Sequence, residues 1–412
     1  MPEFFNVRPP RQAFDELLPY LAPVADIETV ETADSLGRVI ARDVSSSEDL
    51  PAFPRSSMDG YSVRASDTFG ASESLPALFE VVGDIPTGAS SDVRIGIGEA
   101  TVAYTGGTLA DGADAVVMIE RTQPADEVSI EVLRPVAPGE NVIQVAEDIR
   151  CGETLFRAGH RVRPQDIGGL LALGITSVPV YRRPVVGIVS TGDELTHPSV
   201  RPPKGKIRDI NTYTIAARSA QCGAKHISAG IVRDEYEPQL KAARGTLSDA
   251  DVLIFSAGSS LSTRDMTADV FNQLGEPGVL LHGISIKPGK PTVVGVAQGK
   301  PLFGLPGNPV SALVVFDLLV APSIRVLSGE TQAQLLHEVP AILIQDVPSE
   351  SGREDYVPVT LSRLDGRRTA TPVFGKSNLI FTLIRSDGII EIPMDSGGLY
   401  AGETVDVRIY PS

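Results

Sequence analysis

Residues 185–194 read VVGIVSTGDE, a continuous apolar run that ends in a turn of small, hydroxyl-bearing and acidic residues. Such runs are typical of strands buried on both faces of a parallel sheet. Similar runs follow at 226–232, 252–255, 292–296 and 302–305, and helix-like segments occupy 212–222 and 309–327. Buried strands that alternate with helices predict a parallel, doubly wound α/β domain.

The chain on either side of this domain has a different texture. Near the N-terminus, the spacing of Phe14, Leu17, Leu18 and Leu21 predicts a helix, and that of Leu36, Val39 and Ile40 a second short one. Short β-like runs then predict a small, mainly β region, and a further run leads into a helix at 167–173; the runs are 78–82, 100–104, 115–119, 128–133 and 154–162. Residues 332–412 return to short strands with turns, which predicts a second small β domain.

Composition excludes several classes of function. The chain has 412 residues with 36 Lys and Arg against 52 Asp and Glu, a net charge of −16 that argues against binding nucleic acid or anionic membranes. Cys151 and Cys222 lie far apart, and the five histidines follow no metal-ligand spacing. No signal peptide and no run of 18 apolar residues is evident, so we expect a cytoplasmic protein with no segment inserted in a membrane.

Ligands of open α/β sheets bind beyond the carboxyl ends of the strands. Three loops there combine small, hydroxyl and acidic residues that can hold an anion or a divalent cation. The first two also suit ordinary strand ends, and Asn308-Pro309 suits plain helix capping. The candidates in these loops are Ser190, Thr191, Gly192, Asp193 and Glu194, then Ser256, Gly258, Ser260 and Asp265, and then Pro306, Gly307, Asn308, Pro309 and Ser311. Three such ends in one domain favour an anionic ligand at a helix terminus with free amides.

Positive charge in this acidic chain is confined to a few loops, notably Lys287-Pro288-Gly289-Lys290 and the loop of Lys204, Lys206 and Arg208. Solvated loop lysines are the simpler interpretation of each alone. The motifs of P-loop nucleotide hydrolases, dinucleotide-binding Rossmann domains and α/β-hydrolases do not occur. Carboxylates, lysines, hydroxyls and backbone amides remain, a set of groups suited to phosphate or oxyanion chemistry with Mg²⁺.

Together these segments resemble the MoeA/gephyrin E-domain family, the molybdopterin molybdenumtransferases. The matching motifs occur in family order across nearly the whole chain, and it is the ordered set that is specific. They are Ser56-Ser57-Met58-Asp59-Gly60-Tyr61, Thr105-Gly106 with 112–117, Glu147-Asp148-Ile149, Ser190-Thr191-Gly192-Asp193-Glu194-Leu195, Lys287-Pro288-Gly289-Lys290-Pro291, Leu305-Pro306-Gly307-Asn308-Pro309-Val310-Ser311-Ala312 and Ala401-Gly402-Glu403.

The resemblance implies a homodimer of four-domain subunits, with α/β and β parts. Residues 1–48 and 142–180 would form domain I, residues 49–141 an inserted β domain II, residues 181–329 the α/β domain III that binds molybdopterin, and residues 330–412 a small β-barrel domain IV.

Family members insert molybdate into adenylylated molybdopterin, with Mg²⁺-assisted hydrolysis of the adenylate and release of AMP. On matching positions, Glu194, Asp265 and Asp148 would hold metal or position water, with Glu194 and Asp265 as the metal ligands. Lys287 and Lys290 would neutralise oxyanions. The remaining implied residues are Asp59 and Thr105 from the partner subunit's inserted domain, Asp209 and Asn211 in the substrate cleft, and Ser377 from domain IV.

Four positions depart from the family motifs. Ala257 and Ser262 replace glycines, Gly283 replaces a lysine, and Ile210 replaces a serine. A left-handed backbone at either former glycine would cost roughly 1–2 kcal/mol. The alternative hypothesis is therefore a gephyrin-like dimeric scaffold with weakened or lost catalysis, which binds a short peptide of a membrane or cytoskeletal partner such as a cell-division protein. A general sugar- or nucleotide-phosphate enzyme is a third, less favoured interpretation.

Overall fold

The computed structural model describes residues 7–90, 92–257, 261–331 and 337–410, with the backbone only at 257 and 261–265. The chain separates into two compact units. The larger unit comprises 1–42, 158–167 and 177–412, and the smaller comprises 43–157 and 168–176.

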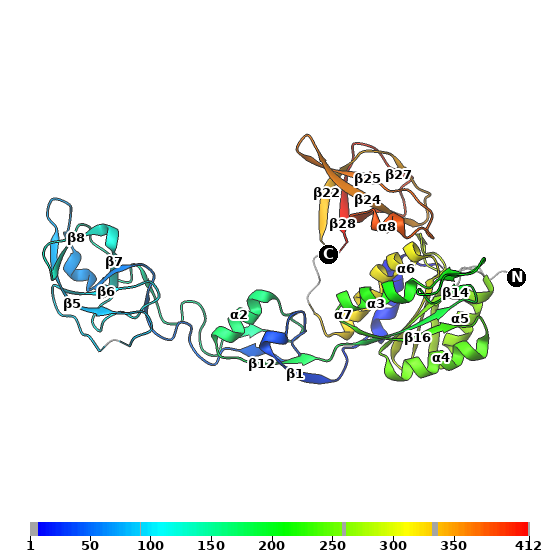
Figure 1. Ribbon diagram of the computed structural model, residues 1–412, viewed down its shortest axis with the longest axis horizontal. Coiled ribbons are helices and arrows are strands. Elements are labelled where there is room, and N and C mark those ends of the chain that lie inside the picture. The colour runs from blue at the N-terminus through cyan, green and yellow to red at the C-terminus, as the bar shows by residue number, and fades with distance from the viewer. Residues whose placement is uncertain (1–6, 91, 258–260, 332–336, 411–412) are drawn as a thin grey trace. The chain divides into compact units, whose positions relative to one another are not determined.

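The larger unit contains a six-stranded sheet in the order β16-β13-β17-β21-β20-β18, whose edge strand β16 is labelled in Figure 1. Its strands are β13 (Val185–Thr191), β16 (Lys225–Val232), β17 (Val252–Ala257), β18 (Pro277–His282), β20 (Val293–Ala297) and β21 (Lys300–Pro306). The first four strands in the sheet order run parallel, and β20 and β18 are antiparallel additions at one edge. The predicted α/β class is thus confirmed, with a mixed rather than wholly parallel sheet.

Helices cover both faces of this sheet, because each face carries a row of fully buried aliphatic side chains. One face packs against α1 (Pro10–Leu17), α3 (Asn211–Gln221) and the run α6 (Pro309–Val315), η5 (Phe316–Val320) and α7 (Ala321–Leu327). The other face packs against α4 (Tyr236–Asp249) and α5 (Leu261–Leu274), where Phe255 and Phe271 meet edge to face.

The run from Pro309 to Leu327 is, among the described residues, the one helical stretch long and apolar enough to cross a membrane by length and composition. It is 67% buried, and Val315, Phe316, Leu319 and Ile324 are wholly enclosed in the α/β core. The burial accounts for its apolar character, because a core helix needs apolar residues around its circumference.

The C-terminal part forms a closed barrel, because β24 pairs with both β25 and β26. Its strands are β22 (Glu338–Leu343), β24 (Glu354–Leu364), β25 (Arg367–Pro372), β26 (Gly388–Ile392) and β28 (Thr404–Ile409), with the short β23 (Val347–Pro348), β27 (Gly398–Leu399) and α8 (Phe381–Ile384) in its loops. The barrel has its own core around Leu343, Val359 and Ile390.

The smaller unit contains a six-stranded sheet in the order β7-β4-β6-β5-β9-β8. Its strands are β4 (Gly60–Val63), β5 (Ala77–Ile85), β6 (Glu99–Ala103), β7 (Ala115–Met118), β8 (Thr122–Pro124) and β9 (Ser129–Val132), and two short pairs are β2 (Val44–Ser45) with β11 (Thr154–Phe156) and β3 (Arg55–Ser56) with β10 (Val142–Ile143). Gly60 is required here, since a Cβ would lie 1.9 Å from the Val117 carbonyl oxygen.

Two local predictions were wrong. The predicted helix at Leu36, Val39 and Ile40 is a turn followed by two bridge residues, because Val39 and Ile40 pair with Arg161 and Val180. The predicted strand 154–162 ends at Phe156, since residues 158–162 turn back toward these bridges. Non-local pairing overrode the apparent helical spacing in both cases. The helix predicted at 167–173 is α2 (Pro164–Ala172).

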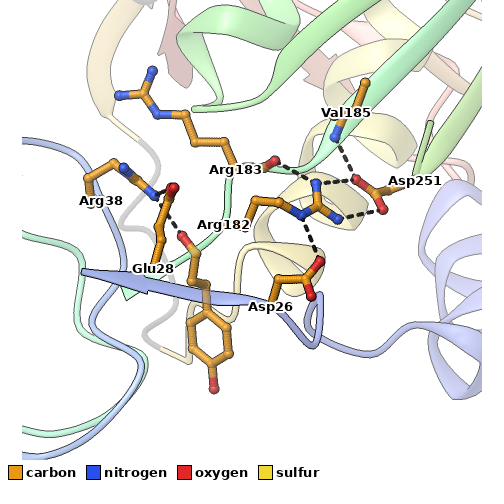
Figure 2. A network of polar contacts seen from close by, with 8 residues as sticks. Asp26, Glu28, Arg38, Arg182, Arg183, Val185 and Asp251 are labelled. Carbon is orange, nitrogen blue, oxygen red and sulfur yellow. Dashed lines mark hydrogen bonds and ion pairs between the residues drawn. The ribbon is translucent and has the colours of Figure 1, made fainter. Parts of the chain in front are cut away.

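Ion pairs join β1 (Ile27–Glu31) and β12 (Ser177–Tyr181) to the amino-terminal end of β13 (Figure 2). Arg182 binds Asp251 through two hydrogen bonds of 2.9 Å, and its Nε lies 3.1 Å from Asp26. Asp251 also accepts the Val185 amide at 2.7 Å. Bidentate pairing of this kind fixes geometry, so the network anchors the start of β13, at the end opposite to the turn at 190–194.

Candidate functional site

The parallel register places three of the predicted loops at one edge of the α/β sheet. Ser190 on β13 lies opposite Ser256 on β17, and residue 257 lies opposite Pro306 on β21. Ser190 and Thr191 belong to the strand itself and are buried, whereas the sequence suggested a turn there. The edge is consequently lined by hydroxyl groups inside the protein rather than on its surface.

A chain of short hydrogen bonds runs through this edge on the side of α3. The Ser190 and Thr212 hydroxyls lie 2.6 Å apart, and Thr212 donates to an Asp209 carboxylate oxygen, also at 2.6 Å. The other carboxylate oxygen of Asp209 accepts the Thr212 amide at 3.1 Å and so caps α3. Ile210 occupies the N-cap position without a capping side chain, and Asp209 supplies the missing acceptor.

Asn211 connects the ends of two strands. Its Nδ2 donates to Ser256 Oγ and to the Gly307 carbonyl oxygen, both at 2.9 Å. Within the described part of the chain, its Oδ1 is buried without a partner, and so is the hydroxyl of Thr191. Because buried polar atoms are nearly always hydrogen-bonded, these two atoms call for a ligand or an ordered water.

The turn after β13 gathers acidic groups. Gly192 has φ +153°, a backbone conformation that favours glycine, and the Glu194 carboxylate lies close to it. Burial raises the pKa of Asp234, and the neighbouring charges of Glu194 and Asp193 add to that shift. The Asp193 carbonyl oxygen accepts a hydrogen bond from Lys206. The three acids form a partly solvated negative cluster.

The structure describes only part of the second predicted loop. Ser256 is buried and bonded to Asn211. Gly258 and Ser260 lie outside the described residues. Asp265 and Ser262 lie on α5, and Ala257 ends β17. For these three residues the structure describes the backbone alone.

The third loop is covered by the barrel. Asn308 is the N-cap of α6 and Pro309 its first residue, as predicted, but the Asn308 side chain does not cap the helix. Instead its Nδ2 donates to Ser377 Oγ at 2.9 Å, and the Val310 amide donates to the Ser377 carbonyl oxygen at 3.1 Å. The expected free amides at this terminus are thus partly occupied by the chain itself. Ser311 and Pro306 are buried beneath, and Gly307 is half-buried.

Lys287 and Lys290 flank a short loop that strand pairing places beside the barrel. Lys287 ends β19 (Ile286–Lys287), which pairs in parallel with β24. Its ammonium lies 3.9 Å from the Asp355 carboxylate, and 62% of its side chain is exposed. Lys290 is exposed, and its carbonyl oxygen accepts the amides of Ile284 and Thr292. Gly289, at φ +124°, leaves no room for a side chain.

Gly283 is one of the positions where the sequence departs from the family motif. It is buried with φ +104°, so the backbone there favours the glycine that this chain carries.

Asp59 and Thr105 lie on the smaller unit, and the structure brings them together. One oxygen of Asp59 accepts the Thr105 amide at 2.8 Å and its hydroxyl at 3.0 Å. The hydrogen bond from the Thr105 amide, and after it the hydrogen bond from the Thr105 hydroxyl, lowers the pKa of Asp59. This pair is exposed, as is Asp148 elsewhere in the unit. The carboxylate of Asp59 is therefore held ionised at the protein surface.

Sequence reasoning missed four residues of this constellation: Thr212, Asp234, Arg353 and Asp355. Thr212 links Ser190 to Asp209, and Asp234 lies close to Glu194. Arg353 Nε lies 2.8 Å from Asp355 Oδ1, next to Lys287. A possible signal was position, since Asp234 follows β16 at the same sheet edge. The barrel residues gave no such signal, because their strand joins Lys287 only through tertiary pairing.

The chain thus combines an α/β domain with a buried polar edge, a closed barrel in the same unit and a separate β unit. Family models match the chain as the MoeA N-terminal region (domain I and II) at 8–174, a probable molybdopterin binding domain at 187–326 and the MoeA C-terminal region (domain IV) at 340–410. The chain belongs to the MoeA family of molybdopterin molybdenumtransferases, which confirms the resemblance and the four-domain, MoeA-like fold class.

Relatives of known name extend over nearly the whole chain. The molybdopterin molybdenumtransferase of Bacillus subtilis (strain 168) is 36% identical over 93% of this chain and 90% of that protein. Molybdopterin molybdenumtransferase 2 of Mycobacterium tuberculosis is 31% identical over 92% of this chain and 94% of that protein. The crystal structure of the molybdopterin biosynthesis MoeA protein from Pyrococcus horikoshii OT3 matches with a TM-score of 0.86 at 32% identity, over 98% of this chain and all of that one.

Proposed function

We propose that this protein is a molybdopterin molybdenumtransferase that inserts molybdate into adenylylated molybdopterin, hydrolyses the adenylate and releases AMP. One observation carries the proposal: the carboxyl edge of the sheet holds a buried polar network in which Asn211 Oδ1 lacks a partner among the described residues. A buried acceptor that is held in place through its own Nδ2 and has no partner among the described residues suits a ligand with N–H groups, such as a pterin.

The remaining candidates have complementary chemistry. Lys287 and Lys290 offer ammonium groups to the oxyanions of molybdate or phosphate, and Lys287 is held close to the barrel by strand pairing. Asp209 and Thr212 keep the hydroxyl of Ser190 oriented. Ser377 offers a hydroxyl beside Asn308. The loop of Ser256, Gly258 and Ser260 would complete the cradle for the phosphate.

Mg²⁺ is part of this proposal, with Glu194 and Asp265 as its protein ligands and Asp148 as a water-positioning group. Among the described residues, no group of three or more Asp, Glu, His or Cys converges as a metal site. Mg²⁺ commonly takes only one or two carboxylates and completes its shell with water and substrate phosphates. Burial is the main cause of the raised pKa of Asp234, but the charges of Glu194 and Asp193 add to it, and a cation would relieve the repulsion among these three carboxylates. When bound, the ion would neutralise charge on the adenylate phosphate.

We also propose that the subunit forms a homodimer and has its domain boundaries as predicted, at residues 48/49, 141/142, 180/181 and 329/330. In this arrangement Asp59 and Thr105 serve the cleft of the other subunit. Their exposure supports this assignment, because a carboxylate kept ionised at the surface is available to a second surface.

A reconstitution assay tests the function. The purified protein is incubated with adenylylated molybdopterin, molybdate and Mg²⁺, and AMP release and the activation of a molybdenum-free apoenzyme are measured. We expect both products, and loss of both when Lys287 and Lys290 are replaced by alanine. Failure of the wild-type protein to release AMP or to complement a molybdenumtransferase-deficient strain at high molybdate would refute the proposal.

A scaffold role is the second candidate, and one feature of the barrel favours it. Four large apolar side chains on the segment 374–384 are exposed by 51% to 65%: Phe374, Leu379, Phe381 and Ile384. Exposed apolar groups that lie close together in sequence suit a peptide partner. Affinity capture with the wild-type protein and with Phe381→Ser and Ile384→Ser tests it; a peptide retained equally by all three would argue against this surface.

A further inference from the structure

A buried carboxylate, Asp355, lies between two cations at the junction of the barrel and the α/β domain. Asp355 is 3% exposed. One of its oxygens is 2.8 Å from Arg353 Nε, and the other is 3.9 Å from Lys287 Nζ. The two oxygens of a single carboxylate thus face two different basic groups.

Backbone pairing fixes this arrangement independently of the side chains. β19 runs parallel to β24, with Ile286 opposite Glu354 and Lys287 opposite Asp355. The Glu354 amide donates to the Ser285 carbonyl oxygen at 2.9 Å. Lys287 therefore emerges from a strand whose register is set by the barrel, and the facing residue in that register is the carboxylate.

The distances from Asp355 indicate different roles for Arg353 and Lys287. A buried carboxylate must be compensated, and Arg353 does this through a charge-assisted hydrogen bond. Arg353 also has an exposed partner, Glu350, at 2.8 Å. Lys287 is attracted to Asp355 but lies beyond direct hydrogen-bonding distance, and most of its side chain is exposed. Asp355 thus attracts the Lys287 ammonium but leaves its hydrogen-bond donors available to another anion.

We propose that Asp355 is a positioning residue of the reaction: it holds the Lys287 ammonium in the orientation that receives the oxyanion of the substrate. This inference rests on the proposed function in so far as Lys287 binds that oxyanion. Without the charge at position 355, Lys287 samples other rotamers. Binding of the anion is then weaker, because it must also order a long side chain, which loses conformational entropy.

Steady-state kinetics of Asp355→Asn against Glu350→Gln test the proposal. Both variants remove a carboxylate that contacts Arg353, but only the first contacts Lys287, so Glu350→Gln is the matched control. We expect the KM for molybdate or for adenylylated molybdopterin to rise about tenfold in Asp355→Asn, with kcat within threefold, and both constants within twofold in Glu350→Gln. An unchanged KM for both substrates in Asp355→Asn would overturn it.

A double-mutant cycle separates positioning from general support of the fold. If Asp355 acts through Lys287, adding Asp355→Asn to Lys287→Ala lowers kcat/KM by less than twofold further. A full tenfold further loss would show that Asp355 acts by another route, and the inference would be abandoned.

Chemical labelling provides a readout that needs no turnover. Lys287 and Lys290 are acetylated with an N-hydroxysuccinimide ester and quantified by peptide mass spectrometry, with Lys290 as the internal reference. We expect acetylation of Lys287 to be about threefold faster in Asp355→Asn and unchanged in Glu350→Gln. Should wild-type protein release no AMP, the proposed function fails, whereas equal labelling rates in wild type and Asp355→Asn would refute the positioning role itself.

Asp355→Glu serves if Asp355→Asn does not fold, as judged by circular dichroism. It keeps the charge, so Lys287 should react with the ester at the wild-type rate. A threefold faster reaction in this variant would contradict the inference.

Discussion

The carboxyl edge of the α/β sheet and the loop tip of the smaller unit present candidate residues in opposite ways. At the sheet edge, Asn211 and Thr212 are buried and bond to groups from several strands. On the smaller unit, Asp59 and Thr105 are exposed and bond chiefly to each other. At the sheet edge, the same hydrogen bonds support both the fold and the proposed site. On the smaller unit, the hydrogen bonds of the candidate residues contribute little to the fold. Substitutions should therefore affect stability and activity together in one region, and activity alone in the other.

The largest combined effect is expected for Asn211→Ala. AMP release should fall about 100-fold or more, and the free energy of unfolding by about 2 kcal/mol, because Ser256 Oγ and the Gly307 carbonyl lose their donor. Activity and urea denaturation of the same preparation measure both. Asn272→Ala is the control, since Asn272 bonds the Val279 amide at 2.9 Å away from the edge. A fully active Asn211→Ala would remove this edge from the site.

Replacing a buried acidic residue outside the site should lower the stability of the protein but leave its activity unchanged. Asp166 bonds His160 at 2.6 Å and Arg163 at 2.9 Å. Burial works to raise the pKa of Asp166, but these hydrogen bonds outweigh it and the net shift is downward. A lowered pKa stabilises the folded state above the unfolded value of 3.8, and this contribution disappears as the pH falls through the folded-state pKa.

Asp166→Asn should therefore lower the free energy of unfolding by about 3 kcal/mol at pH 7. The gap between variant and wild type should narrow below about pH 4, once the unfolded chain is protonated. Urea titrations at a series of pH values measure it, and a gap that is constant with pH would contradict the assignment. Activity at pH 7 should stay within twofold.

Asp59→Ala should lower activity about 100-fold, while the midpoint of urea denaturation stays unchanged because the side chain is exposed. The effect on activity is expected because the proposed dimer needs this carboxylate in the cleft of the other subunit. Asp84→Ala is a matched control: Asp84 is an exposed carboxylate of the same unit that accepts the Tyr104 hydroxyl at 3.1 Å. Equal activities of the two variants would argue against a role for Asp59.

The smallest effect is expected for Thr105→Val, which removes one of two bonds to Asp59 and keeps the backbone amide bond. AMP release should fall about fivefold, and Thr105→Ser should restore it within twofold. A serine variant as slow as Thr105→Val would show that the hydroxyl alone does not support the activity, and the hydrogen bond to Asp59 would then not explain the effect.

Much of the fold was predictable because buried strands carry a strong local signal. The apolar runs at 185–189 and 252–255 correspond to β13 and β17, and the segment 309–327 is helical as predicted. The helix predicted at Leu36–Ile40 failed because its apolar residues serve bridges to Arg161 and Val180, which no local pattern reveals. The antiparallel edge of the sheet, β20 and β18, was likewise beyond local reasoning, since apolar runs do not specify direction.

The sequence alone determined the class of the central domain, the ordered family motifs and the residue types available for oxyanion chemistry, because these depend on neighbours along the chain. Only the tertiary structure decided which groups meet: Asn211 bridging two strand ends, Ser377 over the α6 terminus, and Asp355 opposite Lys287. The physical reason is that hydrogen bonds and ion pairs act over about 3–4 Å in space. The partners in these contacts are separated by 45 to 96 positions along the chain for Asn211 and 69 for Asn308 and Ser377.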